Sequence, residues 1–312
     1  MIPVRLCRHA LTLCGAAAML VGCGARNPYP DPTGSSGVMP QIPRSSMLPQ
    51  AKAGALLYVS NYRNGTVNVY TYPEGSQVDT LTGFAKPLGE CADAAGDVFI
   101  ANSADRDIVE YAHGGSEPIA TLNDSVYYPN GCSVDPTTGN LAVSNGQSKK
   151  RDGSGSIAIY PHAQGKPKYY TGVQYYSSCG YDDDGNLFVA GVGNSDYVLA
   201  ELPKGGTTFN NIRPRNFLAV DLIQWDGRYL TDEVPLAHSS WIYRLKVSGS
   251  NARAIGITKL DEAGASFIER PRVILVSSSG VDFFNYPSGK GPTKKISDSE
   301  GPTGIVVSTA SR

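Results

Sequence analysis

A chain of 312 residues with 35 glycines, 21 prolines and only 18% charged residues has the composition of a turn-rich globular protein, not of a helical or disordered one. Its formal net charge of −1 excludes a whole-chain electrostatic affinity for nucleic acid or for an anionic membrane, because both require a basic footprint. Binding must therefore be local, and no nucleic-acid partner is expected.

Residues 1–22 have the organisation of a secretory signal peptide. Arg5 and Arg8 give a positive start, and Ala10–Val21 is an apolar stretch too short to span a bilayer. The sequence Leu-Val-Gly-Cys that ends at Cys23 resembles the bacterial lipobox, in which the peptide is cut before the cysteine and the thiol carries the lipid. This resemblance implies a membrane anchor on Cys23. The alternative is an ordinary secretory signal with an incidental cysteine.

Residues 23–54 predict a tether, because prolines lie among serines and glycines without a periodic apolar pattern. These prolines are Pro28, Pro30, Pro32, Pro40, Pro43 and Pro49. Gly24, directly after the predicted lipidated cysteine, resembles the outer-membrane address of lipoproteins in Gram-negative bacteria. We therefore expect a cell-envelope protein anchored to the outer membrane. The sequence does not decide between the periplasmic face and the surface face of that membrane.

From residue 55 to 312 the chain repeats one unit of short strands. The clearest copy has an inner strand opened by Pro-x-Gly at 129–131, a turn at 135–139, and two further strands at 141–144 and 156–160. The second strand of the unit recurs every ~40–50 residues, a period typical of propellers. Its copies fall at Leu57, Val98, Leu141, Leu187, Tyr229 and Val273. The third strands are predicted at 66–72, 107–111, 156–160, 197–202, 241–245 and 281–286, and the fourth strands at 78–81, 119–122 and 294–296.

These units predict an all-β fold: a six-bladed β-propeller of four-stranded antiparallel blades. The first unit lacks a Pro-x-Gly inner strand, whereas Pro302–Gly304 near the C-terminus matches Pro87–Gly89. We therefore expect the strand at Ile305–Ser308 to complete the first blade and close the ring, which removes the open edges of an unclosed array. The fifth unit, 217–232, is degenerate, and the inner strand of the sixth is blurred near 265–268.

The phrase Gly-x-Leu-[Phe/Tyr]-Val-Ala-Asn, followed by x-Val-x-x-Tyr, resembles the six-bladed propellers of the NHL-repeat and gluconolactonase-like superfamily. The gluconolactonase branch holds a divalent metal at the mouth of the central channel with Glu, Asn and Asp side chains at the starts of inner strands. The corresponding positions here are Glu90, Asn130, Ser178 and Glu300. The resemblance implies a calcium site in which Glu90 and Asn130 would be the ligands. Ser178 departs from the pattern, no Asp general base can be named, and a polar lining of a wet channel is the alternative.

Three cysteines, Cys91, Cys132 and Cys179, fall on successive predicted inner strands. The expected compartment permits disulfides. The favoured pair is Cys132 with Cys179, because each stands three residues before an aspartate, Asp135 or Asp182. Use of all three as small buried apolar residues is an equal alternative.

Other polar residues are expected to be structural. Asparagines end several second strands, and aspartates precede the glycines of the hairpin turns, as turn chemistry requires. They are Asn61, Asn102, Asn145, Asp93, Asp135 and Asp182. No catalytic residue is predicted, because the chain has no Gly-x-Ser-x-Gly elbow and the histidines after residue 22 lie in turns or loops. These are His113, His162 and His238.

Several of the 18 tyrosines occur as pairs, and some pairs flank the Pro-x-Gly openings on one face. The pairs are Tyr127-Tyr128, Tyr169-Tyr170 and Tyr175-Tyr176. Aromatic faces with a polar rim are typical of interfaces, although tyrosine is also common in sheet packing. We predict a binding or scaffolding module for a protein, peptide or glycan partner, without a cofactor. The alternative is a metal-dependent lactonase or lyase of the gluconolactonase or streptogramin-lyase type, with calcium at the channel mouth.

Overall fold

The computed structural model describes residues 53–150, 154–172, 174–193, 196–216, 220–298 and 301–310. The predicted signal peptide, the lipidation residue Cys23, nearly all of the predicted tether and the predicted mouth residue Glu300 lie outside these ranges. The described residues belong to one compact unit. None of their helices is long and apolar enough to cross a bilayer. Apart from a short 3-10 turn, η2 (Pro161–Ala163), the regular structure is strand.

Within the described ranges the strands form four four-stranded sheets and one eight-stranded sheet. The first sheet contains β24 (Pro302–Ser308), β1 (Leu56–Asn61), β2 (Thr66–Thr71) and β3 (Gln77–Thr82). The second contains β4 (Pro87–Ala92), β5 (Val98–Asn102), β6 (Asp107–Tyr111) and β7 (Pro118–Asn123). The third contains β8 (Tyr127–Val134), β9 (Leu141–Ser148), β10 (Ser156–Tyr160) and β11 (Lys168–Tyr170). The last contains β20 (Ala265–Glu269), β21 (Arg272–Ser277), β22 (Gly280–Asn285) and β23 (Lys294–Ser297).

The eight-stranded sheet differs from the prediction of separate four-stranded blades. One run contains β12 (Tyr175–Tyr181), β13 (Leu187–Val192), β14 (Tyr197–Leu202) and β15 (Asn210–Arg215). The other contains β16 (Leu222–Trp225), β17 (Leu230–Pro235), β18 (Ser240–Ser248) and β19 (Asn251–Leu260). Each run is antiparallel, and a short parallel pairing of 213–215 with 251–253 joins their outer strands. The join arises because β15 leaves β14 after Ile212 and continues along β19.

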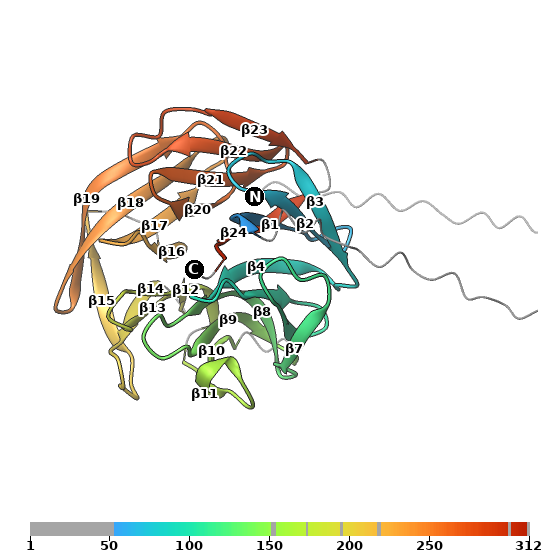
Figure 1. The fold of residues 1–312 in the computed structure, drawn as a ribbon. Coiled ribbons are helices and arrows are strands. Elements are labelled where there is room, and N and C mark those ends of the chain that lie inside the picture. The colour runs from blue at the N-terminus through green and yellow to red at the C-terminus, as the bar shows by residue number, and fades with distance from the viewer. Residues whose placement is uncertain are drawn as a thin grey trace, which may run out of the picture. The chain divides into compact units, whose positions relative to one another are not determined.

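The sheets are arranged around a common centre (Figure 1). The innermost strand of each antiparallel run is β24, β4, β8, β12, β16 or β20, one edge strand of that run. Neighbouring innermost strands contact one another around the ring, in the order β24, β4, β8, β12, β16, β20 and back to β24. The chain therefore closes on itself. The fold is all-β and propeller-like.

The core consists of apolar layers between adjacent sheets. Strand β5 shows how the alternation of side chains builds these layers. Val98 and Ile100 pack with Leu56 and Tyr58 of the first sheet, whereas Phe99 between them packs with the third sheet. A similar apolar layer separates the two runs of the eight-stranded sheet, which therefore pack face to face. Strand β5 therefore buries both faces, as its near-continuous apolar sequence predicts.

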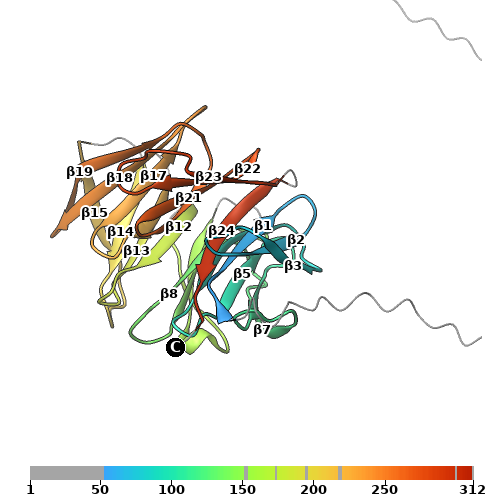
Figure 2. The same cartoon turned by 45° about the horizontal axis from the view of Figure 1, so that its top comes forward.

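The C-terminal strand closes the ring, as the sequence predicted. Strand β24 pairs antiparallel with β1, with Ser308 opposite Leu56 and Ile305 opposite Val59. Figure 2 shows β24 alongside β1. His113 lies at one end of this pairing, where its ring nitrogens are 2.6 Å from the Ser308 hydroxyl and 3.0 Å from the Gly54 carbonyl, just before β1.

Aspartate side chains stabilise the hairpin turns between innermost and second strands. The Asp182 carboxylate accepts backbone N–H bonds from Asp184 at 3.0 Å and Asn186 at 2.8 Å. Asp93, Asp135 and Asp226 accept backbone bonds in the same way. The structural role predicted for these aspartates is confirmed, and Asp226 extends it to the degenerate fifth unit.

Candidate functional site

The innermost strands surround a cavity of about 580 Å³. Three of the four predicted mouth residues, Glu90, Asn130 and Ser178, line this cavity. The fourth lies outside the described residues. The contacts of the three show which of them is available to a ligand.

Glu90 is almost completely buried, with 8% of its surface exposed. The Ser60 hydroxyl of β1 donates to Oε1, and Oε2 has no hydrogen-bond partner among the described residues. Burial raises the pKa of Glu90 to about 8, although the Ser60 hydrogen bond opposes this. The carboxyl group is therefore protonated at neutral pH, a form poorly suited to binding a hard cation.

Asn130 links innermost strand β8 to β12, and Ser178 links β12 to β16. The Asn130 amide donates to the Tyr175 hydroxyl at 2.9 Å and to the Tyr176 carbonyl at 3.2 Å. The Ser178 hydroxyl donates to the Asp221 carbonyl and accepts from the Ile223 N–H, both at 2.8 Å. These contacts give both side chains a structural role. Across the described parts of the chain, no group of three or more His, Cys, Asp or Glu side chains is placed to hold a metal ion.

An acidic cluster at the same mouth was missed by the sequence reasoning. It consists of Asp221, just before β16, and of Asp232 and Glu233 on β17, of which Asp221 and Glu233 line the cavity. The Asp221 N–H donates to the Asp232 carboxylate at 2.9 Å. Glu233 accepts from the N–H and hydroxyl of Ser266, each at 2.8 Å.

Burial governs the ionisation of this cluster. It raises the pKa of Asp232 to about 7 and that of Glu233 to about 7, and the charge of Asp221 adds to both shifts. The pKa of Asp221 is also raised by burial. One sequence signal could have found the cluster: Asp232-Glu233 occupies the second-strand position where other units carry Val-Ser or Val-Ala.

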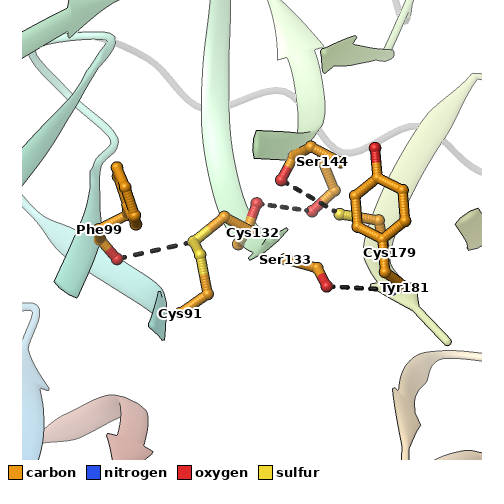
Figure 3. Close-up of a disulfide and its surroundings, with 9 residues drawn as sticks. Cys91, Phe99, Cys132, Ser133, Ser144, Cys179 and Tyr181 are labelled. Carbon is orange, nitrogen blue, oxygen red and sulfur yellow. Dashed lines mark hydrogen bonds between the residues drawn. A yellow bond between two sulfur atoms is a disulfide. The ribbon is translucent and has the colours of Figure 1, made fainter. Parts of the chain in front are cut away.

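The predicted pairing of Cys132 with Cys179 is wrong. The disulfide joins Cys91 to Cys132, with Cα atoms 5.5 Å apart, and Cys179 is a buried free thiol (Figure 3).

The reason lies in the alternation of side chains along a strand. Cys132 and Cys179 have the same offset in successive units, so both point back toward the preceding sheet. Cys132 Sγ lies 3.6 Å from the Phe99 carbonyl of β5, and Cys179 Sγ lies 3.6 Å from the Ala142 carbonyl of β9. One sheet therefore separates the two thiols. Cys91 is displaced by one residue relative to its turn aspartate, so it points forward and meets Cys132 in their shared layer.

Exposed apolar residues form a row next to the mouth. Tyr175 on β12 pairs with Val192 on β13, which pairs with Tyr197 on β14. Their exposed fractions are 37%, 40% and 52%. Directly paired residues lie on the same side of a sheet, about 5 Å apart, so these side chains form one continuous surface. Because Tyr175 also lines the cavity, the row ends at the mouth.

The other tyrosine pairs are mainly packing residues. Tyr169 stacks at a tilt on Tyr127, with ring centroids 5.2 Å apart, and donates to the buried Asp124 carboxylate at 2.7 Å. Tyr170 packs edge-on against Phe209 at 5.5 Å. The exposed row is therefore the aromatic surface that can serve a partner.

No family model and no curated protein sequence matches the chain. Among solved structures, the chain is similar to one from the crystal structure of a nidogen/laminin complex, with a TM-score of 0.63 and 13% sequence identity. The match covers 82% of this chain and 99% of that one. At this identity the likeness shows the fold alone, and it supports a β-propeller-like fold.

Proposed function

We propose that the protein is a binding or scaffolding module for a protein, peptide or glycan partner. The observation that carries this proposal is the exposed row of Tyr175, Val192 and Tyr197 at the rim of the cavity. Aromatic side chains beside polar groups supply large contact areas at interfaces. The contacts of Asn130 and Ser178 with neighbouring strands favour this role over a metal-dependent lactonase or lyase.

The scaffold proposed for this module is a six-bladed propeller of the NHL-repeat and gluconolactonase-like kind. Two observations support six blades: each run of the eight-stranded sheet is antiparallel and four strands long, and an apolar layer separates the two runs. The parallel pairing of β15 with β19 then links the outer edges of two blades.

The module is proposed to be a lipoprotein of the cell envelope, attached through Cys23 to the outer membrane, with residues 24–54 as its tether. The support is the sequence Leu-Val-Gly-Cys after an apolar stretch. Growth with an alkyne-bearing fatty acid should label the wild-type protein, and Cys23→Ser should remain unlabelled. Labelling of Cys23→Ser would contradict the anchor.

The binding role is tested with arrays of peptides and glycans probed by the purified full chain. The variant with Tyr175→Ser and Tyr197→Ser should lose most binding, by at least about tenfold, because aromatic residues dominate interface energies. A matched control is Tyr229→Ser, on a half-buried tyrosine in the Asp226 turn, at the other end of its sheet. Calcium titration followed by thermal melting, with lactone hydrolysis assayed alongside, should show neither a shift nor turnover. A calcium shift with turnover, and no array binding, would contradict the proposal.

A further inference from the structure

The acidic cluster at the mouth leaves two carboxylate oxygens unsatisfied. Asp232 is fully buried, and its Oδ1 accepts the N–H of Asp221. Its Oδ2 has no hydrogen-bond partner in the described part of the chain, and neither does Oε1 of Glu233, which lines the cavity. A buried carboxylate oxygen without a donor costs free energy unless a ligand or water supplies the donor.

The cavity beside this cluster is negatively charged. Its lining includes the acidic residues Asp93, Asp221 and Glu233 beside the protonated Glu90, and among the described lining residues there is no lysine, arginine or histidine. A cavity with one sign of charge and walls of low dielectric concentrates ions of the opposite sign. The electrostatics therefore favour a cation.

The rest of the lining is largely apolar. Leu222, Ile223, Trp225 and Phe267 all contribute to it. A volume of about 580 Å³ is within the range that encloses a small organic molecule. A bare metal ion would leave this apolar surface unused, whereas a cation with a hydrocarbon stem would cover it.

We propose that the cavity binds an organic cation, with an alkylammonium group held at the mouth by Asp221 and Glu233, which both line it, and its apolar stem enclosed between the innermost strands. The ammonium group supplies three N–H donors, and one of them satisfies the free Oε1 of Glu233. Asp221, only half-buried, provides a carboxylate at the solvent side of the same group. The cation is either a free amine or a lysine side chain of a partner. The second source rests on the binding role proposed above, and the first is independent of it.

Three probes of equal chain length separate charge from apolar burial in the purified full chain. Hexylammonium should raise the melting temperature by several degrees at millimolar concentration, whereas 1-hexanol and hexanoate should leave it within one degree. Equal shifts with hexylammonium and 1-hexanol would overturn the proposal, because the acidic cluster would then contribute nothing. The absence of a shift with hexylammonium would overturn it as well.

Substitutions of the acidic residues test whether hexylammonium binds at the mouth of the cavity. Asp221→Asn should weaken hexylammonium binding at least about tenfold, since it removes a charge-assisted partner at unchanged size. Glu233→Gln should do the same, and circular dichroism checks that both variants fold. The control is Asp183→Asn, an exposed turn residue at the other end of β12, which loses the same charge. Unchanged affinity in both folded mouth variants would contradict the assignment.

A blocked tripeptide, acetyl-Gly-Lys-Gly-amide, distinguishes the two sources of the cation. Binding of the tripeptide as tight as that of hexylammonium supports a partner's lysine, and binding of hexylammonium alone supports a free amine. If the array partners still bind while every amine fails, the organic-cation proposal falls and the binding role stands.

Discussion

Glu90 lies on β4 with one carboxyl oxygen bound to Ser60 and the other without a hydrogen-bond partner in the described structure. The two residues belong to neighbouring sheets, so the contact joins the first sheet to the second near the mouth. Burial keeps this carboxyl protonated, and the contact is therefore a neutral hydrogen bond. Deprotonation would place an uncompensated charge at a buried position, and this would destabilise the folded state.

The pH dependence of stability follows from the raised pKa of Glu90. In the unfolded chain the group titrates near its ordinary value of 4.5, and in the folded protein near about 8. Between these two values the unfolded state releases the proton and the folded state retains it. The contribution of Glu90 to the free energy of unfolding is therefore complete below pH 4.5. It falls as the pH rises toward 8, by at most about 1.4 kcal/mol per pH unit.

Glu90→Gln should remove this contribution, because the amide keeps the shape of the acid and cannot ionise. We expect the free energy of unfolding in urea to fall less steeply between pH 5 and 8 in the variant than in the wild type. Other buried acids, such as Asp124 and Asp232, affect both proteins equally, so the difference isolates Glu90. Identical pH profiles would show that Glu90 is ionised in the folded protein.

At the scale of strands and sheets, the disulfide joins β4 to β8 and closes a loop of 41 residues between successive sheets. Cys132→Ala should lower the free energy of unfolding by about 2–4 kcal/mol, since the cross-link restricts the unfolded chain. Reductant should destabilise the wild type and have no further effect on Cys132→Ala.

Cys179→Ala is the matched control for this comparison, because it removes a buried thiol that forms no disulfide. This variant should remain sensitive to reductant. Loss of that sensitivity in Cys179→Ala, with its retention in Cys91→Ala, would indicate the Cys132–Cys179 pairing instead.

Second and third strands were predictable because each carries a run of apolar residues bounded by turn residues. The bounds predicted at 107–111 and 156–160 coincide with β6 and β10. Outer strands such as β15 and β19 were not predicted, because they alternate weakly and are partly exposed. Their parallel pairing depends on where the chain turns in space, which the repeat does not encode.

The candidate site was predictable only as a location. The repeat identified the starts of the inner strands, and these do surround the cavity. The contact of Glu90 with Ser60 and the cluster of Asp221 with Asp232 each depend on side chains from different strands. The offset within a unit gave the position of each cysteine, but the predicted pairing ignored the face toward which each side chain points.

At the scale of the whole molecule, closure of the ring gives the cavity its wall. Strand β24 pairs with β1 and contacts β4 and β20, its two neighbours in the innermost ring. The Thr303 hydroxyl of β24 lies 3.2 Å from both the Ser60 carbonyl of β1 and the Pro87 carbonyl of β4, so it links these three strands. Without β24 the first sheet would lose its innermost strand and the cavity would open.

Amide hydrogen exchange of β24 tests this closure most directly. In the full chain, exchange followed by mass spectrometry should show the amides of 305–308 as strongly protected as those of β1, and both should be exposed only by global unfolding. Exchange of 305–308 within seconds, at the rate of an exposed chain end, while β1 stays protected, would contradict a ring closed by its C-terminal strand.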